Sequence, residues 1–484
     1  MQIDYIGSLP LIVIWLALGA IGIVIQAFVR DNTRLVFGYY VATLGLTGLA
    51  AIVLSGHKGA SFGGMITLGG YANYFDALFC GAGIMALLAA RPYLQKEESE
   101  VDEFYTMLVS SVAGMMLMAH ASNLVVLFVG IELMSISFYV MAGFFRTSTK
   151  SVEAALKYFL LGCFATGFLV YGMSLIYGGT GSLAYGDIAR TVVTQQLTYP
   201  TLFVVGTTLL VIGLSFKIAA FPFHQWAPDV YEGAPTAVTA FMSTAGKAAA
   251  FSAFVAVFVA LLPAGWTSEI AQNQQIVIAV IAAATMLLGN ITAVVQSNVK
   301  RMLAYSSVAH AGYMLMGILA GPSLGTDGMN GHHAIVFYAT SYLFMQMGAF
   351  VVVGILERRD GGFLNIDDYA GLHHRHPVLA ALMAVFMFSL AGIPPFAGFF
   401  GKYMLFAAAI ERGFTWLAIV GVVSSVISAW FYLGLIVKMY FQDAKDSGHE
   451  APAGLAGFTL AVSVVGVVFF GLFPQLLINI FRSW

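Results

Sequence analysis

Long apolar segments recur along the whole chain, and they constrain its fold more than any other feature of the sequence. Only 9% of the residues are charged, whereas a soluble globular protein carries about 25%. A helix of about 20 apolar residues crosses the hydrocarbon core of a bilayer. The sequence therefore predicts an all-α polytopic protein of the lipid bilayer, with a single membrane domain over residues 1–484.

About fourteen segments have the length that a membrane-spanning helix requires. The predicted spans are 8–28, 35–55, 71–90, 102–120, 123–143, 155–178, 201–224, 235–262, 273–297, 301–321, 333–356, 377–410, 415–440 and 456–481. Span seven contains Pro222, and span twelve contains Pro394 and Pro395. Proline lacks a backbone N–H and clashes with the preceding turn. We therefore predict that helices 7 and 12 are broken.

The lysines and arginines between the spans predict the orientation, because cytoplasmic loops are enriched in these residues. With the N-terminus outside, the inner connections hold 13 of them and the outer connections hold 4. The inner set is Arg30, Arg34, Arg91, Lys96, Arg146, Lys150, Lys300, Arg301, Arg358, Arg359, Arg375, Lys438 and Lys445, and the outer set is Lys58, Arg190, Arg412 and Arg482. This bias predicts that both termini face the periplasm.

The two proline interruptions also predict an internal repeat. Pro394 lies 172 positions and five spans after Pro222, and a shift by an odd number of spans inverts a repeat in the membrane. We expect helices 1–3 over residues 1–100, a first five-helix repeat over 101–262, an inverted second repeat over 273–442, and helix 14 over 455–484.

The strongest candidates for proton transfer are charged residues deep inside predicted spans, where hydrophobicity should exclude them: Glu132, Lys217, Lys247 and Lys402. An unpaired charge at the bilayer centre costs at least ~2.5–3.5 kcal/mol, so we expect one acid and several lysines in an ion-paired row. Burial favours the neutral form of a lysine, and a nearby carboxylate favours the charged form. A lysine whose carboxylate partner moves can thus take up or release a proton. The alternative is that these charges only fix helix packing, or that Lys402 extends to the membrane surface.

Three further residues are weaker candidates for proton transfer. Lys157 lies near one end of its span. An ordinary lysine at the membrane interface explains this position as well as a role in proton transfer does. His310 lies deep in span ten, as either a hydrogen-bonded core residue or a proton relay. His224 follows Pro222 and is a candidate for the proton entry.

Redox cofactors are not predicted in this chain, because it has no flavin or dinucleotide loop and no cysteine cluster. Cys80 and Cys163 each lie in an apolar run, which disfavours a disulfide or metal site. The net charge of −2 is spread between the spans, and no nucleic-acid partner is predicted. The first span is long and has no basic segment before it, so it is expected to be retained rather than cleaved as a signal peptide.

Three motifs resemble one family, the subunit N family of respiratory complex I, the NADH:quinone oxidoreductase (subunit 2 in mitochondria). They are HQWAPDVYEGAPT at His224–Thr236, KRMLAYSSVAHAGYM at Lys300–Met314 and SLAGIPPFAGFFGKY at Ser389–Tyr403. The resemblance implies fourteen helices, inverted five-helix repeats and one proton channel per subunit. It also implies that the family's proton-carrying residues are matched here by Glu132, Lys157, Lys217, Lys247 and Lys402.

The resemblance also implies the partners. NADH, FMN, iron–sulfur clusters and quinone would bind to partner subunits, and antiporter-like subunit M and small membrane subunits would flank this chain in a bacterial inner membrane. Subunit M usually has glutamate at the position of Lys402, and subunit L continues into a lateral helix, whereas this chain ends at Trp484. The alternatives are a subunit of a cation/proton antiporter, of a related membrane-bound hydrogenase or dehydrogenase, or a structural scaffold.

Overall fold

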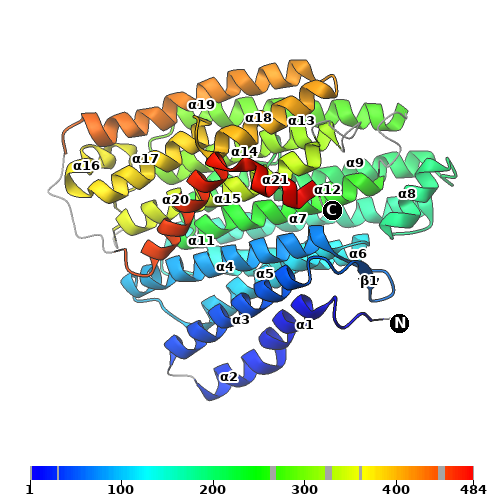
Figure 1. Cartoon of the computed structure of the whole chain (residues 1–484), viewed down its shortest axis with the longest axis horizontal. Helices are drawn as coiled ribbons and strands as arrows, with labels where there is room; N and C mark the ends of the chain where they lie inside the picture. The colour runs from blue at the N-terminus through cyan, green and yellow to red at the C-terminus, as the bar shows by residue number, and fades with distance from the viewer. Residues whose placement is uncertain are drawn as a thin grey trace.

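The structure is a computed structural model that describes residues 3–29, 32–261, 269–321, 330–358, 362–444 and 453–482. Most of its helices run alongside one another in one bundle, with connections at the two ends (Figure 1). Arg30, Arg359, Lys445 and Trp484, which entered the sequence predictions, lie outside the described residues.

The N-terminal third consists of helices and one short hairpin. Its elements are α1 (Leu9–Leu16), a π-helical turn (Ala17–Ile21), α2 (Gly22–Phe28), α3 (Thr33–Val53), β1 (Gly59–Ser61), β2 (Ile66–Leu68), α4 (Gly70–Lys96), α5 (Asp102–His120) and α6 (Leu124–Ala142). The hairpin pairs Gly59 with Leu68 in antiparallel register.

The middle of the chain contains the first helix break. Its elements are α7 (Thr149–Thr180), α8 (Tyr185–Val193), α9 (Pro200–Lys217), α10 (Trp226–Gly233), α11 (Thr236–Phe241), a second π-helical turn (Met242–Gly246), α12 (Lys247–Leu261), α13 (Glu269–Val294) and α14 (Val299–Ala320).

The last part contains the second break. Its elements are α15 (Gly331–Leu356), a 3-10 turn (Ile366–Tyr369), α16 (Leu372–Arg375), α17 (Pro377–Ala391), α18 (Ala397–Glu411), α19 (Thr415–Phe441), α20 (Ala456–Leu472) and α21 (Pro474–Arg482).

Each of the fourteen predicted segments coincides with one helix or with consecutive helical pieces, so the predicted all-α membrane fold is confirmed. Ten helices in the described residues are long and apolar enough to cross a membrane, or up to eleven if the bent pair α20 and α21 is one span. The number of fourteen crossings stays a prediction.

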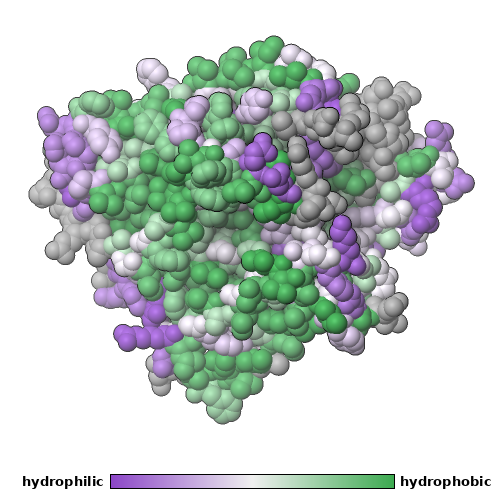
Figure 2. Space-filling view, viewed as in Figure 1, coloured by the Kyte–Doolittle hydropathy of each residue, from purple (hydrophilic) through white to green (hydrophobic). Residues whose placement is uncertain are grey.

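The surface matches a lipid environment. Ile419, Val422, Val426 and Trp430 of α19 are exposed large apolar residues. Figure 2 shows a broad hydrophobic face across the middle of the bundle, with hydrophilic residues gathered toward its two ends. An exposed apolar surface of this extent is typical of a membrane or subunit contact.

Both predicted breaks are present, and their freed backbone groups bond within the protein. After α9 ends, the Phe221 N–H donates to Thr285 Oγ1 at 2.9 Å, and the Ala220 N–H donates to the carbonyl of Ser215 at 2.9 Å. Pairing of this kind is required wherever a helix is interrupted at membrane depth.

In the second break, between α17 and α18, the Ile393 N–H donates to the Phe388 carbonyl at 3.0 Å. The Gly398 N–H donates to Ser389 Oγ at 3.2 Å. The prolines thus interrupt both helices without leaving these donors unpaired.

The prediction of one uninterrupted helix over 456–481 is wrong. The chain bends by 82° between α20 and α21, and Pro474 begins α21, so its missing N–H and its ring end α20. A Cβ on Gly471 would lie 2.1 Å from the Pro395 carbonyl oxygen. The end of α20 therefore packs directly against the break between α17 and α18.

Candidate functional site

Lys217 is the last residue of α9 and lies at the first break, beside the interruption that Pro222 predicted. Its side chain is 8% exposed, and its Nζ donates to Ser135 Oγ of α6 at 2.8 Å. Ser135 in turn donates to the Ile131 carbonyl at 2.6 Å. The buried ammonium group therefore has a neutral hydroxyl as its hydrogen-bond partner.

Glu132 lies one helical turn before Ser135 on α6 and is half-buried. Thr166 of α7 donates to Glu132 Oε1 at 2.8 Å, and among the residues that the structure describes Lys217 bonds to Ser135 rather than to the Glu132 carboxylate. Residues three positions apart lie on the same face of a helix, so the acid and the contact of Lys217 are neighbours. Ser135 is thus the direct hydrogen-bond partner of Lys217 in this structure, and the modulation of Lys217 by Glu132 stays a prediction.

Lys247 begins α12 and is 3% exposed. Its Nζ donates to both the carbonyl and the hydroxyl of Ser307 on α14, the latter at 2.6 Å. It also lies 5.9 Å from the ring centre of Tyr342. This lysine is likewise held by neutral oxygens and an aromatic face.

His310 of α14 is buried between two tyrosines, in agreement with the prediction that it bonds to neighbours. Its Nδ1 lies 2.5 Å from the Tyr338 hydroxyl and its Nε2 lies 3.1 Å from the Tyr432 hydroxyl. Tyr432 also bonds to Ser306 on α14. The imidazole thus belongs to a continuous chain of hydroxyl groups.

Lys402 of α18 lies against the second break and is 5% exposed. Its Nζ donates to the carbonyls of Leu390 and Ala391 at 3.1 and 3.0 Å, and to Ser425 Oγ at 2.8 Å. It lies 4.9 Å from the ring centre of Tyr313. A cation at the C-terminal end of α17 interacts favourably with the helix dipole.

Helix α14 connects these sites. Ser307, His310 and Tyr313 follow one another at intervals of three residues and lie along one face, over about 9 Å at ~1.5 Å per residue. Ser307 binds Lys247 and the ring of Tyr313 meets Lys402. The sequence analysis missed these hydroxyl residues, although the pattern of small polar and aromatic residues around His310 was visible.

Lys157 lies away from this row. It forms ion pairs with Asp229 and Glu153, both at 2.7 Å, and its side chain is 41% exposed. Arg301 of α14 also binds Asp229, at 2.7 Å. Burial alone would raise the pKa of Asp229, but the hydrogen bonds from Lys157 and Arg301 outweigh burial and lower the pKa from its ordinary value. The position favours the interfacial alternative for Lys157.

His224 lies in the first break, where its ring stacks on that of Phe221 with centres 6.0 Å apart. Its Nδ1 is buried without a hydrogen-bond partner in the described structure. It has no hydrogen bond to Lys217 or Lys247.

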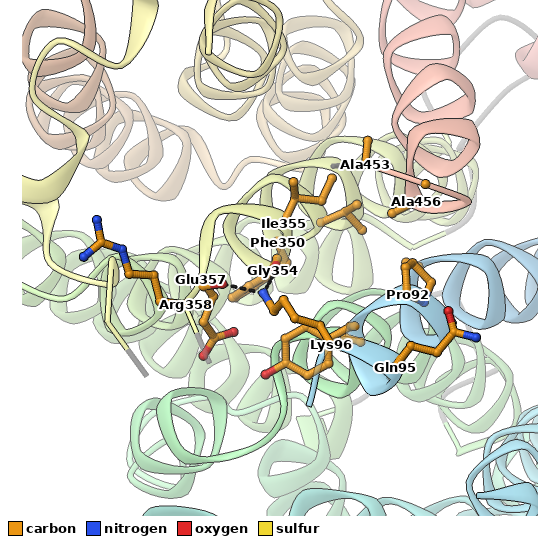
Figure 3. Close-up of a pocket in the computed structure, with 15 residues that line it drawn as sticks. Pro92, Gln95, Lys96, Phe350, Gly354, Ile355, Glu357, Arg358, Ala453 and Ala456 are labelled. Carbon is orange, nitrogen blue, oxygen red and sulfur yellow. Dashed lines mark hydrogen bonds between the residues drawn. The ribbon is translucent and has the colours of Figure 1, made fainter. Parts of the chain in front are cut away.

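A further lysine, Lys96, contacts the C-terminal end of α15. Figure 3 shows Lys96 of α4 reaching the end of α15, where it donates to the carbonyls of Gly354 and Glu357. The carboxylate of Glu357 accepts a hydrogen bond of 2.6 Å from Thr236. A cavity of about 330 Å³ lies beside these residues, with Ala453 and Ala456 on its other side.

Within the described residues, no group of three or more His, Cys, Asp or Glu side chains is arranged to hold a metal ion. The groups that contact the three buried lysines and His310 are hydroxyls, aromatic rings and backbone carbonyls. Lysines, hydroxyls and an imidazole exchange and carry protons.

The broken helices and the buried row of lysines define an antiporter-like ion-translocating membrane subunit. A family model described as NADH:quinone oxidoreductase/Mrp antiporter matches residues 121–428. NADH-quinone oxidoreductase subunit N of Trichlorobacter lovleyi is 43% identical over 96% of this chain and 94% of its own length. The counterpart in Rhodospirillum rubrum is 42% identical over 87% and 84%. The chain belongs to the subunit N family of NADH-quinone oxidoreductase.

Solved structures agree with this assignment. A chain of respiratory complex I from Thermus thermophilus, with bound aureothin, matches with a TM-score of 0.82 at 31% identity, over 97% of this chain and 98% of that chain. The Mrp complex from Dietzia sp. matches with a TM-score of 0.84 at 23% identity, over 99% and 96%. The latter similarity concerns the fold alone.

Proposed function

We propose that this chain is the proton-translocating subunit N of a redox-driven NADH:quinone oxidoreductase. The observation that carries the proposal is the buried row itself. Lys217, Lys247 and Lys402 are each at most 8% exposed, and each donates to neutral oxygens rather than to an acid. A charged lysine without a counterion is costly in a dry interior, so a small electrostatic change is enough to alter its protonation.

Glu132 supplies that change in this proposal. A conformational step that brings its carboxylate toward Lys217 favours the ammonium form, and withdrawal favours release of the proton. The proton then passes to Lys247 and along Ser307 and His310, and Lys402 releases it to the outside. His224 assists entry, and Lys157 holds helix α10 in place through its ion pair with Asp229.

The proposal also covers the internal repeat and the orientation of the chain in the membrane. Helices 4–8 and 9–13, over residues 101–262 and 273–442, act as inverted repeats, and both termini face the periplasm of a bacterial inner membrane. NADH, FMN, iron–sulfur clusters and quinone bind to other subunits, and antiporter-like subunit M is an adjacent partner. This chain performs no redox chemistry and receives energy by conformational or electrostatic coupling.

The test is Lys217→Arg in the assembled complex, reconstituted in vesicles that contain a pH-sensitive dye. Arginine keeps the charge and donates to Ser135, but it does not release its proton at accessible pH. We expect normal assembly and proton transport reduced about tenfold. Lys150→Arg is the matched control, because Lys150 is 69% exposed and pairs with Glu232. Normal transport by the Lys217→Arg complex would contradict the proposal.

A further inference from the structure

A second pair of ionisable side chains is buried outside the lysine row. Asp76 of α4 and His120, the last residue of α5, are both 0% exposed. His120 Nε2 lies 2.8 Å from Asp76 Oδ2, and His120 Nδ1 lies 2.8 Å from the carbonyl oxygen of Thr67 in β2. Burial of two such groups in a membrane helix bundle is costly and is typical of a functional site.

The contacts determine where the protons lie. A carbonyl oxygen only accepts hydrogen bonds, so the Nδ1 of His120 carries a proton that it donates to Thr67. The contact between Nε2 and Oδ2 then holds one further proton. That proton is on the imidazole beside a carboxylate, or on the carboxyl beside a neutral imidazole. Both arrangements have zero net charge, so the proton moves between the groups without creating a net charge in a dry site.

The other carboxyl oxygen is open to a proton. Asp76 Oδ1 is buried and has no hydrogen-bond partner in the described structure, and the same holds for Asn73 Oδ1, one turn earlier on α4. Asn73 is held by its amide, which donates to the carbonyl of Leu54, directly after α3, at 2.7 Å. A buried oxygen without a donor costs about 1–3 kcal/mol. A water or an added proton at Asp76 Oδ1 removes this cost.

The surroundings leave few other groups that titrate. On α4, Cys80 lies one turn after Asp76 and is buried. On α3, the hydroxyl of Thr47 is also buried without a partner in the described structure. From β2 only the Thr67 carbonyl reaches the pair, and from α5 only His120 itself.

A cavity of about 600 Å³ is lined by residues next to the pair, although neither Asp76 nor His120 lines it directly. Thr67 and both chain neighbours of His120, Ala119 and Ala121, line it. His332 of α15 also lines it, and its Nε2 is buried without a partner in the described structure. A water occupies about 30 Å³, so the cavity has room for several. It lies at the end of the bundle that carries β1, where the connections are poor in lysine and arginine (Figure 1).

We propose that Asp76 and His120 form a second proton-binding site, at the outer end of the membrane domain and close to a cavity with room for water. This inference rests on the proposed function. A proton binds to Oδ1 of the Asp76 carboxylate beside the imidazolium and is later released toward the cavity, so one proton enters for each proton that leaves. The pair receives protons that leave the lysine row.

The alternative is a purely structural clamp, in which His120 ties the hairpin to α4. Asp76→Asn separates the two roles, because asparagine keeps the size and its amide can donate to the unprotonated Nε2 of a neutral His120, but it cannot bind a proton. We expect normal assembly, and a fall of about tenfold in protons transported per electron. A carboxylic acid band in the infrared difference spectrum of turnover should also disappear.

Asp4→Asn is the matched control, because Asp4 forms an Asp–His pair with His57 at 2.6 Å on the surface. We expect transport by Asp4→Asn to equal that of the unmodified complex. The infrared band should persist in this control.

Lys217→Arg, measured in parallel, separates the two proposals. If Asp76→Asn transports normally while Lys217→Arg does not, the second site is overturned and the proposed function stands. If both transport normally, both proposals fall. If Asp76→Asn does not assemble, His120→Asn decides, since its amide can still donate to Thr67. Normal transport by His120→Asn, or failure of both variants to assemble, leaves the structural clamp as the role of the pair.

Discussion

The two halves of the membrane domain share the same helix caps and backbone bridges, but they carry different functional side chains at matching positions. Asn123 caps α6 and forms an isolated bridge with Ala184, and Asn298 caps α14 and bridges to Asn365. Asn298 lies 175 positions after Asn123. This correspondence supports the proposed repeat.

The same offset places Ser307 opposite Glu132 and His310 opposite Ser135. The first half therefore has an acid and a hydroxyl where the second half has a hydroxyl and an imidazole. In this comparison, the first half contains the charge that modulates a lysine, and the second half contains the groups that pass a proton on.

The two breaks differ in the residue that satisfies their carbonyls. In the second half, the carbonyls of Leu390 and Ala391 would accept hydrogen bonds from the residues four positions later, which are Pro394 and Pro395. Proline has no N–H, and Lys402 supplies the missing donor.

In the first half, Trp226 Nε1 donates to the Phe216 carbonyl at 3.0 Å instead. An indole thus holds the first break, and Lys217 remains available to Ser135. We infer that Lys217 serves mainly in proton transfer, whereas Lys402 serves in proton transfer and also stabilises the second break.

The largest expected effect follows from this difference. Lys402→Met leaves the Leu390 carbonyl without its donor and the Ala391 carbonyl with only the 3.4 Å hydrogen bond from Ser425, and a buried carbonyl without a donor costs about 1–3 kcal/mol. Removal of a buried charge offsets part of the summed cost, so we expect a net destabilisation of about 2–3 kcal/mol. Lys217→Met should cost less than about 1.5 kcal/mol, because Ser135 keeps its bond to Ile131. Thermal unfolding of the purified complexes measures both, and equal losses would contradict the comparison.

A smaller effect is expected from Glu132→Gln. This variant removes the negative charge of the first half, which has no counterpart at the matching position of the second half. Glutamine still accepts the hydrogen bond from Thr166, so the unfolding temperature should stay near that of the unmodified complex. Proton transport should fall about tenfold, equivalent to ~1.4 kcal/mol in the barrier. Ser307→Ala, at the matching position, removes only a hydroxyl because its carbonyl still binds Lys247, and should reduce transport less. The order of the two losses in vesicle assays is the decisive result.

The sequence predicted the structure best at residues that are unusual in an apolar membrane helix. Prolines in apolar runs predicted both breaks, and charges in apolar runs identified the lysines that the structure buries. The partners of those lysines were not predictable, because serine, tyrosine and backbone carbonyls are common in any membrane helix, and their role depends on which helices meet.

Two other features were not predicted from the sequence, because they depend on packing between segments that are distant in the chain. The bend at Pro474 fits against the second break, and nothing local distinguishes this proline from one at an ordinary helix end. The Asp76–His120 pair joins helices whose spacing in the sequence carries no motif.

The smallest expected effect concerns the ion pairs that join the halves at the surface. Asp229 lies on α10 of the first half and binds Arg301 on α14 of the second half. The pKa of Asp229 is lowered from its ordinary value of 3.8, so the carboxylate stabilises the fold above that pH. The stabilisation is lost as the pH falls through the lowered pKa.

Because the Asp229 side chain is 35% exposed, solvent screening limits the contribution to about 0.5–1 kcal/mol at pH 7. Asp229→Asn should therefore lower the unfolding temperature slightly at pH 7. The difference from the unmodified complex should shrink below pH 4 and at high salt, which screens exposed charges. A loss that persists unchanged at low pH and high salt would show that Asp229 contributes through packing rather than charge, and that the halves are not joined electrostatically at this surface.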